Sequence, residues 1–188
     1  MGTNELTWFN QLPARAAEQM LLDCCSAPAW AGPMTAGRPY ASAADAIRRS
    51  GSIVAALSVA DLAEALAGHP RIGERPATNY DSASQEGASQ NGAGHERAGA
   101  ADWSRQEQSG VDADDTATKR ALAQANLEYE ERFGHIYLVC ASGRTGTELL
   151  ALLRGRLQNE PEDEWQVVRT ELQKINALRL QRLLAGAA

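Results

Sequence analysis

The chemically most informative residue of the sequence is an arginine on the last predicted helix, which we expect over residues 161–184. An apolar stripe with the three- and four-residue spacing of one helical face is formed there by Trp165, Val168, Leu172 and Ile175. Arg179 takes the next position on this stripe. Because an uncompensated buried charge costs about 3–5 kcal/mol, its guanidinium must reach an anion. The spacing leaves three interpretations open: the helix end frays into solvent, Arg179 pairs with a structural carboxylate, or it anchors a carboxylated ligand.

A histidine is the second candidate for chemistry. His69 follows Gly68, where a helix that begins at the capping-box sequence Ser58-Val59-Ala60-Asp61 is predicted to end. The C-terminal end of a helix favours a cation and can therefore raise the pKa of His69. Two interpretations stay open, since the imidazole can transfer a proton or can only cap the terminal carbonyls of the helix.

Polar side chains gather again in the sequence Ser104-Arg105-Gln106-Glu107-Gln108. Ser104 and Glu107 have the spacing of a capping box, whose role would only be to start a helix. Alternatively, Ser104, Glu107 and Gln108 lie on one helical turn beside a ligand. A carboxylate next to a carboxamide can orient an imidazole, or it can bind the N–H and C=O groups of a small molecule.

Several common catalytic motifs are excluded. A cysteine-dependent phosphatase needs its cysteine six residues before the arginine of the loop, whereas Cys140 is four residues before Arg144 and position six is Leu138. A phosphate-handling enzyme built on Arg144 is therefore disfavoured. No P-loop, G-x-S-x-G elbow or H-E-x-x-H motif occurs. The cysteines Cys24, Cys25 and Cys140 form no C-x-x-C pair, which predicts reduced thiols in a cytoplasmic protein without a metal site.

The elements that must position these residues are predicted to be helices. Besides the two already described, we expect helices from Pro13 to about Cys24, Ser26 to Met34, Ser42 beyond Ile47, Asp114 or Asp115 to Phe133, and Thr145 or Thr147 to Leu157. The run from Ile136 to Ala141 is strongly β-like but has no second strand to pair with. We expect it to be extended between helices, with unpaired backbone groups that a ligand could bind.

Length and composition fit a single all-α domain over residues 1–188. The chain is 44% hydrophobic, has only 2 Phe and 4 Tyr, and carries a net charge of −6, which argues against nucleic acid and anionic membrane surfaces as partners. No run approaches 18 apolar residues, so we expect no membrane span. Residues 77–101 are rich in Gly, Ser, Asn and Gln without a helical or strand period, and we interpret them as a flexible surface insertion.

Taken in order, these pieces resemble the 2-oxo-4-hydroxy-4-carboxy-5-ureidoimidazoline (OHCU) decarboxylases of uric acid degradation. The matching pieces are Cys24-Cys25-Ser26, Trp30, Arg38-Pro39, His69-Pro70-Arg71-Ile72-Gly73, Ser104-x-x-Glu107-Gln108, Phe133-Gly134 with the extended run after it, Lys174-Ile175 and Leu178-Arg179-Leu180. The resemblance covers the chain from about Leu6 to Leu184. It departs at residues 77–101, and at Phe133-Gly134-His135-Ile136, where the family often has Phe-Gly-Phe-Pro; the direction of His135 stays open.

The resemblance implies an all-helical fold, commonly a homodimer, that uses no cofactor. It implies that His69 is the catalytic proton donor, that Glu107 assists it and that Arg179 holds an anionic part of the substrate. The substrate heterocycle would be contacted by Pro70, Ser104, Gln108 and the backbone of Tyr137, Leu138, Val139, Cys140 and Ala141. The implied product is (S)-allantoin, released with CO2. The alternative is a helical interaction or dimerisation module that kept the fold and lost the reaction.

Overall fold

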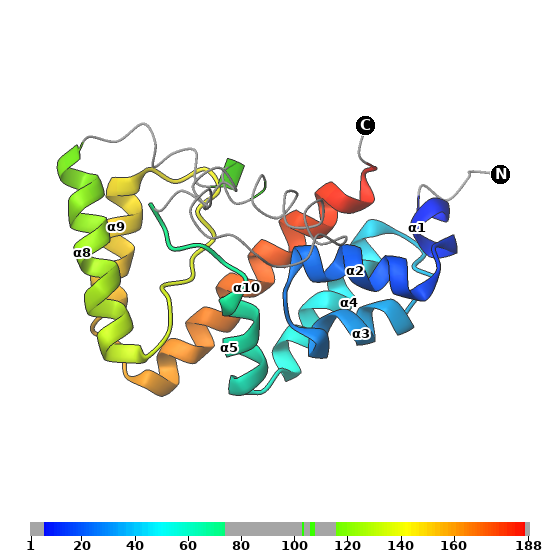
Figure 1. Cartoon of the computed structure of the whole chain (residues 1–188), viewed down its shortest axis with the longest axis horizontal. Helices are drawn as coiled ribbons and strands as arrows, with labels where there is room; N and C mark the ends of the chain where they lie inside the picture. The colour runs from blue at the N-terminus through cyan, green and yellow to red at the C-terminus, as the bar shows by residue number, and fades with distance from the viewer. Residues whose placement is uncertain (1–5, 74–102, 104–105, 108–115, 187–188) are drawn as a thin grey trace, which may run out of the picture.

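The computed structural model describes residues 6–73, 103, 106–107 and 116–186. Within these residues the backbone forms helices and no strand, which confirms the predicted all-α fold (Figure 1). The helices are α1 (Thr7–Gln11), α2 (Ala14–Cys24), α3 (Pro28–Ala36), α4 (Ala43–Ala56), α5 (Val59–Ala67), α8 (Thr116–Phe133), α9 (Gly146–Arg156) and α10 (Pro161–Leu184). The predicted insertion at residues 77–101, together with Ser104 and Gln108, lies outside the described residues.

The predicted helix boundaries follow from local capping. Ser42 accepts a hydrogen bond from the backbone N–H of Asp45 and starts α4. A reciprocal capping box starts α5 at Ser58, as the sequence predicts. Another starts α9 at Thr145, one of the two positions that the sequence left open. Gly134 ends α8 with a φ of 74°, a left-handed conformation that glycine adopts without steric cost.

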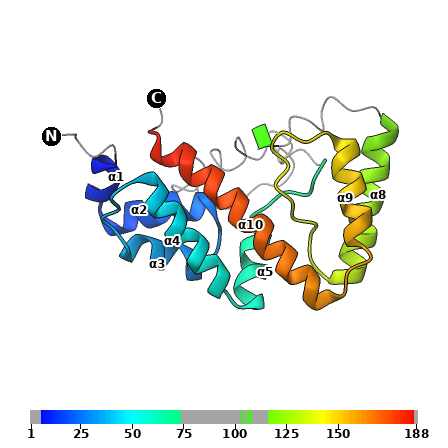
Figure 2. The ribbon, with the colours of Figure 1, turned by 180° about the vertical axis from the view of Figure 1, so that it is seen from behind.

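The longest helix, α10, connects the two ends of the molecule. Figures 1 and 2 show α1 to α4 gathered at one end and α8 with α9 at the other, while α10 passes from one group to the other. Its 24 residues span about 36 Å at the standard rise of an α-helix. One rigid element therefore carries residues that reach both groups of helices.

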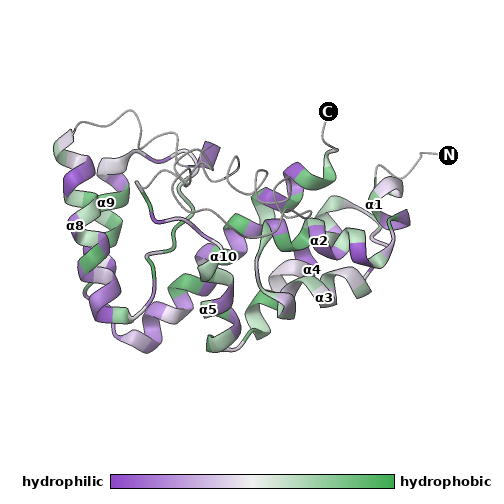
Figure 3. Cartoon of the chain, in the orientation of Figure 1, coloured by the Kyte–Doolittle hydropathy of each residue, from purple (hydrophilic) through white to green (hydrophobic). Residues whose placement is uncertain are grey.

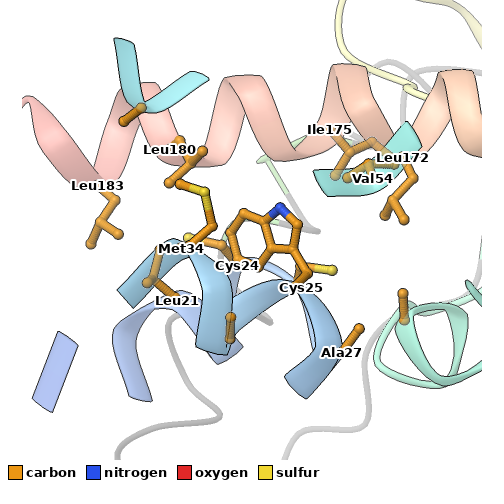
Figure 4. Close-up of a cluster of buried hydrophobic side chains, with 14 of the residues drawn as sticks. Leu21, Cys24, Cys25, Ala27, Met34, Val54, Leu172, Ile175, Leu180 and Leu183 are labelled. Carbon is orange, nitrogen blue, oxygen red and sulfur yellow. The ribbon is translucent and has the colours of Figure 1, made fainter. Parts of the chain in front are cut away.

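The main core packs α10 against the N-terminal helices. Figure 4 shows this contact, with side chains of α2, α3 and their link, including Cys24, Cys25 and Met34, facing Leu172, Ile175 and Leu180. The predicted apolar stripe of α10 is buried at these positions and at Val168, whereas Trp165 is half-buried. The stripe prediction is thus confirmed for the part of α10 that leads up to Arg179.

A second buried cluster joins α8, α9 and the extended run from Ile136 to Ala141. Its largest members are Leu122, Tyr129, Tyr137, Leu149 and Leu153. The extended run crosses between the helices without pairing to a strand, as predicted. Figure 3 shows apolar and polar residues interspersed along α8 and α10. The buried residues of α10 include the polar Glu164, Glu171, Asn176 and Arg179.

No single helix in the described part of the chain is both long and apolar enough for a membrane span. The pair α4 and α5 meets those criteria only when both helices are counted together across a bend of 119°.

Candidate active site

One small cavity brings together residues that are far apart in the sequence. It holds about 310 Å³ of space, its mouth included, at the junction of the end of α5, the extended run and α10. Its described lining consists of His69, Pro70, Ile72, Glu107, Tyr137, Leu138, Val139, Ala141, Ile175 and Arg179. The imidazole, carboxylate and guanidinium selected from the sequence therefore share a cavity.

Arg179 is buried and has a carboxylate as its partner. Its Nε donates to Oε1 of Glu107 at 3.1 Å and its Nη2 donates to Oε2 at 2.9 Å, so the ion pair is bidentate. Arg179 is 3% exposed and Glu107 is 8% exposed, so both charges are largely removed from water. Arg182 adds a second, longer contact to Oε1 at 3.3 Å. Glu107 is thus the anion that the stripe position of Arg179 required, and it also lines the cavity.

The hydrogen bonds of His69 determine its tautomer. Its Nδ1 lies 2.9 Å from the carbonyl oxygen of Ala65. A carbonyl oxygen can only accept, so Nδ1 carries the proton. Its Nε2 lies 3.3 Å from Nη1 of Arg179, which can only donate, so Nε2 presents its lone pair. The imidazole is therefore neutral, with an acceptor nitrogen directed at the guanidinium.

The helix end does not raise the pKa of His69. Burial and then the positive charge of Arg179 lower its pKa from 6.5 to about 3, and the bond to the Ala65 carbonyl offsets this only in part. The prediction considered the partial negative charge at the end of α5 and missed a full positive charge from α10. Burial is the larger cause, and the charged neighbour that lowers the pKa of His69 further is 110 positions away in the chain.

Glu107 interacts with His69 only indirectly, through the guanidinium of Arg179. Among the described residues, no hydrogen bond joins its carboxylate to the imidazole, and both carboxylate oxygens accept from arginines of α10. Arg179 stands between the two, since it donates to both Glu107 and His69. The structure thus shows Glu107 fixing the guanidinium rather than orienting the imidazole.

The extended run forms one wall of the cavity and is held by side chains. Nη1 of Arg156 donates to the carbonyl of Leu138 at 2.7 Å, and the N–H of Cys140 donates to Oε2 of Glu171 at 2.9 Å. In an extended chain the N–H and C=O of one residue share a direction that alternates along the backbone. Anchoring positions 138 and 140 therefore turns the backbone groups of Val139 to the opposite side. No hydrogen bond to those groups exists among the described residues.

Arg156 belongs to a buried polar network that the sequence did not reveal. Its Nε donates to Oε1 of Glu164 at 2.7 Å, and Glu164 is fully buried. Tyr129 donates its hydroxyl to the same carboxylate, and Asn159 donates from Nδ2 to Oε2 at 2.7 Å. The guanidinium also lies over the ring of Tyr137, 4.7 Å from its centroid. Through the bond from Arg156 to the Leu138 carbonyl, this network therefore holds the extended run that forms one wall of the cavity.

The remaining predicted site residues fall into two groups. Pro70, Tyr137, Leu138, Val139 and Ala141 line the cavity, whereas Cys140 does not, because its amide turns to Glu171 and its side chain packs against the main core. His135 lies away from the cavity lining, with its ring 4.2 Å from that of Trp165. Ile72, Ile175 and Arg182 were missed as site residues. Ile175 and Arg182 lie one turn on either side of Arg179, so their helical spacing was the available signal.

Comparison with known proteins identifies the family of the chain. The profile of the OHCU decarboxylase family matches residues 10–181. The chain is 31% identical over 170 residues to the "Uric acid degradation bifunctional protein TTL" of Arabidopsis thaliana, which aligns 88% of this chain with 46% of that protein. It is 30% identical over 157 residues to the 2-oxo-4-hydroxy-4-carboxy-5-ureidoimidazoline decarboxylase of Amia calva, covering 84% of this chain and 81% of that protein.

A solved structure extends the similarity to three dimensions. A crystal structure of OHCU decarboxylase in the presence of (S)-allantoin superposes with a TM-score of 0.71 at 28% identity, covering 89% of this chain and 99% of that one. The fold and the family profile define a helical carboxy-lyase. The chain belongs to the OHCU decarboxylase family, which confirms the resemblance drawn from its motifs. It spans about half the length of the bifunctional Arabidopsis protein.

Proposed function

We propose that this chain decarboxylates OHCU to (S)-allantoin and CO2 in the degradation of uric acid. The observation that carries this proposal is the shared cavity in which the neutral imidazole of His69 faces the guanidinium of Arg179. The family profile and the related structure crystallised in the presence of (S)-allantoin support the same reaction.

The substrate can supply its own electron sink. Its carboxylate is bonded to a ring carbon that also bears a hydroxyl and is adjacent to a C=N bond. When the bond to CO2 breaks, its electron pair forms a double bond between the two ring carbons, and the π pair of the C=N bond moves to nitrogen, which takes up a proton. Loss of the hydroxyl proton then forms the new C=O, and the ring carbon that was part of C=N is protonated.

A neutral His69 fits the proton transfers of this reaction. In the resting site the lone pair of Nε2 accepts from Arg179. When the guanidinium turns to the anionic substrate, this lone pair is released and its basicity rises, so that the imidazole first accepts the hydroxyl proton and then returns a proton to carbon. His69 is in this proposal a donor only after it has acted as a base. Such proton transfer is worth about 10²–10⁴-fold in rate, which is roughly 3–5 kcal/mol. Delivery from one face gives a single enantiomer.

Arg179 and the extended wall supply charge and orientation. The guanidinium is held by Glu107 and directed into the cavity, where it can bind an anionic part of the substrate. Contacts to the departing carboxylate alone would stabilise the ground state as well and gain no rate. The backbone groups of Val139 can instead bind the amide-like ring as charge develops on it. Ser104 and Gln108 stay in the proposal as substrate contacts from the sequence resemblance.

Two further properties belong to the proposal. We expect a homodimer, as the family resemblance implies, and analytical ultracentrifugation at micromolar concentration tests it. We expect a cytoplasmic chain, supported by the three cysteines being free thiols. Fractionation of the source cells tests that expectation. The alternative of a non-catalytic interaction module is separated from the enzyme by activity alone.

The decisive experiment supplies the substrate enzymatically. Urate is oxidised with urate oxidase and the hydrolase that follows it, the purified chain is added, and the circular dichroism of allantoin is recorded. We expect the signal of one enantiomer to appear faster than in buffer, in proportion to enzyme concentration. Unchanged kinetics relative to buffer would reject the enzyme and favour the interaction module.

A further inference from the structure

The short link between α2 and α3 touches both sides of the candidate active site. The carbonyl of Cys24, at the C-terminal end of α2, accepts a hydrogen bond from Nη1 of Arg179 at 3.1 Å. Two residues later, the side chain of Ser26 lies directly against the backbone of Gly68. Gly68 immediately precedes His69 at the end of α5. Cys24 at the end of α2 therefore contacts the guanidinium, and Ser26, two residues further on, contacts the backbone that carries the imidazole.

The contact with Ser26 explains why position 68 is a glycine. Gly68 has a φ of −88°, which any residue adopts, so its backbone conformation does not require glycine. A Cβ at this position would lie 1.8 Å from Oγ of Ser26 and 2.7 Å from its Cβ. Rotation of the serine side chain moves Oγ but leaves Cβ in place. A side chain at position 68 is therefore excluded by Ser26 alone.

The link cannot yield to such a side chain, whereas the end of α5 can. Ser26 is flanked by Cys25, which is 1% exposed, and Ala27, which is fully buried, and both belong to the main core (Figure 4). Ser26 and Gly68 are both exposed, but Gly68 is flanked by the exposed Ala67 and the half-buried His69, whereas both neighbours of Ser26 are buried. Any displacement caused by a side chain at position 68 therefore falls on the end of α5 and on His69.

The beginning of α5 is fixed independently. Nη1 of Arg169 on α10 donates to the carbonyls of Val54 at 2.6 Å and Leu57 at 2.8 Å, at the bend between α4 and α5. The bend therefore stays in place when the other end of α5 moves. The position of His69 relative to Arg179 then depends on the contact at Gly68.

We propose that Ser26 and Gly68 form a positioning contact, which sets the separation between the imidazole of His69 and the guanidinium of Arg179. The inference rests on the proposed function for its kinetic consequence, since it assigns a role in the same site. Ser26 and Gly68 act through His69 and are positioning residues rather than catalytic ones.

Substitution of Gly68 by alanine tests the contact. A misplacement of about 1 Å in a catalytic group can lower a rate by about 100-fold, so we expect kcat of Gly68→Ala to fall by about that factor. KM should change little, because Arg179 keeps its bonds to Glu107 and Cys24. Ser26→Gly alone should also lower kcat, because it removes the contact. Ser26→Gly/Gly68→Ala should restore most of kcat, because the methyl group of the alanine takes the space that the serine side chain leaves. Gly155→Ala is the matched control, because nothing lies within 4 Å of its added Cβ.

A second readout does not depend on activity. The chain has three histidines, so the imidazole ¹⁵N signals of His69 can be assigned by substitution. In Gly68→Ala we expect the pKa of His69 to move back toward its ordinary value, because the imidazole withdraws from Arg179. Wild-type titration and kcat in Gly68→Ala, or a double variant no better than the single one, would overturn the proposal. An inactive wild type would reject the proposed function, and the titration would still decide the contact.

Discussion

Arg179 donates to Nε2 of His69 across 3.3 Å, although the two residues are 110 positions apart in the chain. This contact and the bond from Nδ1 to Ala65 leave the imidazole neutral, with its lone pair directed at the guanidinium. A histidine at a helix end is ordinarily a candidate cation. Here burial and the guanidinium reverse that tendency and keep His69 neutral in the resting protein.

Loss of the basic nitrogen should abolish catalysis without unfolding the chain. His69→Asn keeps an N–H that can donate to the Ala65 carbonyl but has no basic nitrogen, and His69→Ala removes both. We expect both variants to lower kcat by about 10²–10⁴-fold in the allantoin assay. His135→Asn is the control, since the ring of His135 lies against Trp165 and not in the cavity lining. Turnover close to wild type in His69→Asn would remove His69 from the mechanism.

The lowered pKa of His69 predicts an acid-sensitive stability. In the unfolded chain His69 takes up a proton near pH 6.5, whereas in the folded chain it stays neutral down to about pH 3. Between these values the unfolded state binds more protons, so the free energy of unfolding falls as the pH decreases through this window. Urea unfolding of the wild type and His69→Asn between pH 7 and about pH 5 measures this contribution above the carboxylate range.

The expected result is a steeper loss of stability on acidification for the wild type than for His69→Asn. His135 also has a lowered pKa, through burial, but it is present in both proteins and cancels in the difference. Parallel stability curves for the two proteins would show that the folded state protonates His69 as readily as the unfolded state does.

Variants that break the ion pair between Glu107 and Arg179 should change both the free energy of unfolding and the KM for the substrate. Glu107→Ala leaves a buried guanidinium with reduced compensation, so we expect a loss of about 3–5 kcal/mol in the free energy of unfolding. Arg179→Ala should raise KM strongly, and its stability loss should be smaller, because Glu107 keeps its contact to Arg182. The double variant should be more stable than the sum of the single losses predicts, with a coupling of about 1–3 kcal/mol. Additive losses would contradict a direct interaction.

Variants of the buried pair of Arg156 and Glu164 should separate effects on stability from effects on substrate binding. Arg156→Met alone should cost about 3–5 kcal/mol, because the fully buried carboxylate of Glu164 loses its charge partner. Arg156→Met/Glu164→Leu should recover much of this stability, since apolar residues can replace a buried pair. It should not recover KM, because the carbonyl of Leu138 still lacks its donor. A double variant with wild-type KM would show that the wall is positioned without Arg156.

The sequence predicted the helices well because their signals are local. The capping residues Ser42, Ser58 and Thr145 each act within four positions, and the structure places all three at helix starts. The stripe on α10 correctly placed Arg179 in a buried position facing an anion. These predictions depend only on the hydrophobic periodicity and the capping residues of a single helix.

The sequence could not predict which residues meet across elements. Nothing near His69 indicates that a guanidinium from α10 would lower its pKa. Glu164 and Arg156 are buried as a pair although both residue types usually lie on surfaces, so neither could be recognised without the other. Only the family resemblance joined distant pieces into one site, and it did so without distances or proton positions.

Three side chains that form or support the cavity project from the same helix, α10. Glu171 holds the wall, Ile175 lines the cavity and Arg179 supplies the guanidinium, at intervals of four residues along a single uninterrupted helix. Inserting one residue between Glu171 and Arg179 would rotate the guanidinium by about 100° around the axis, out of the cavity. The stretch of α10 from Glu171 to Arg179 must therefore keep its residue count for all three side chains to serve the same cavity.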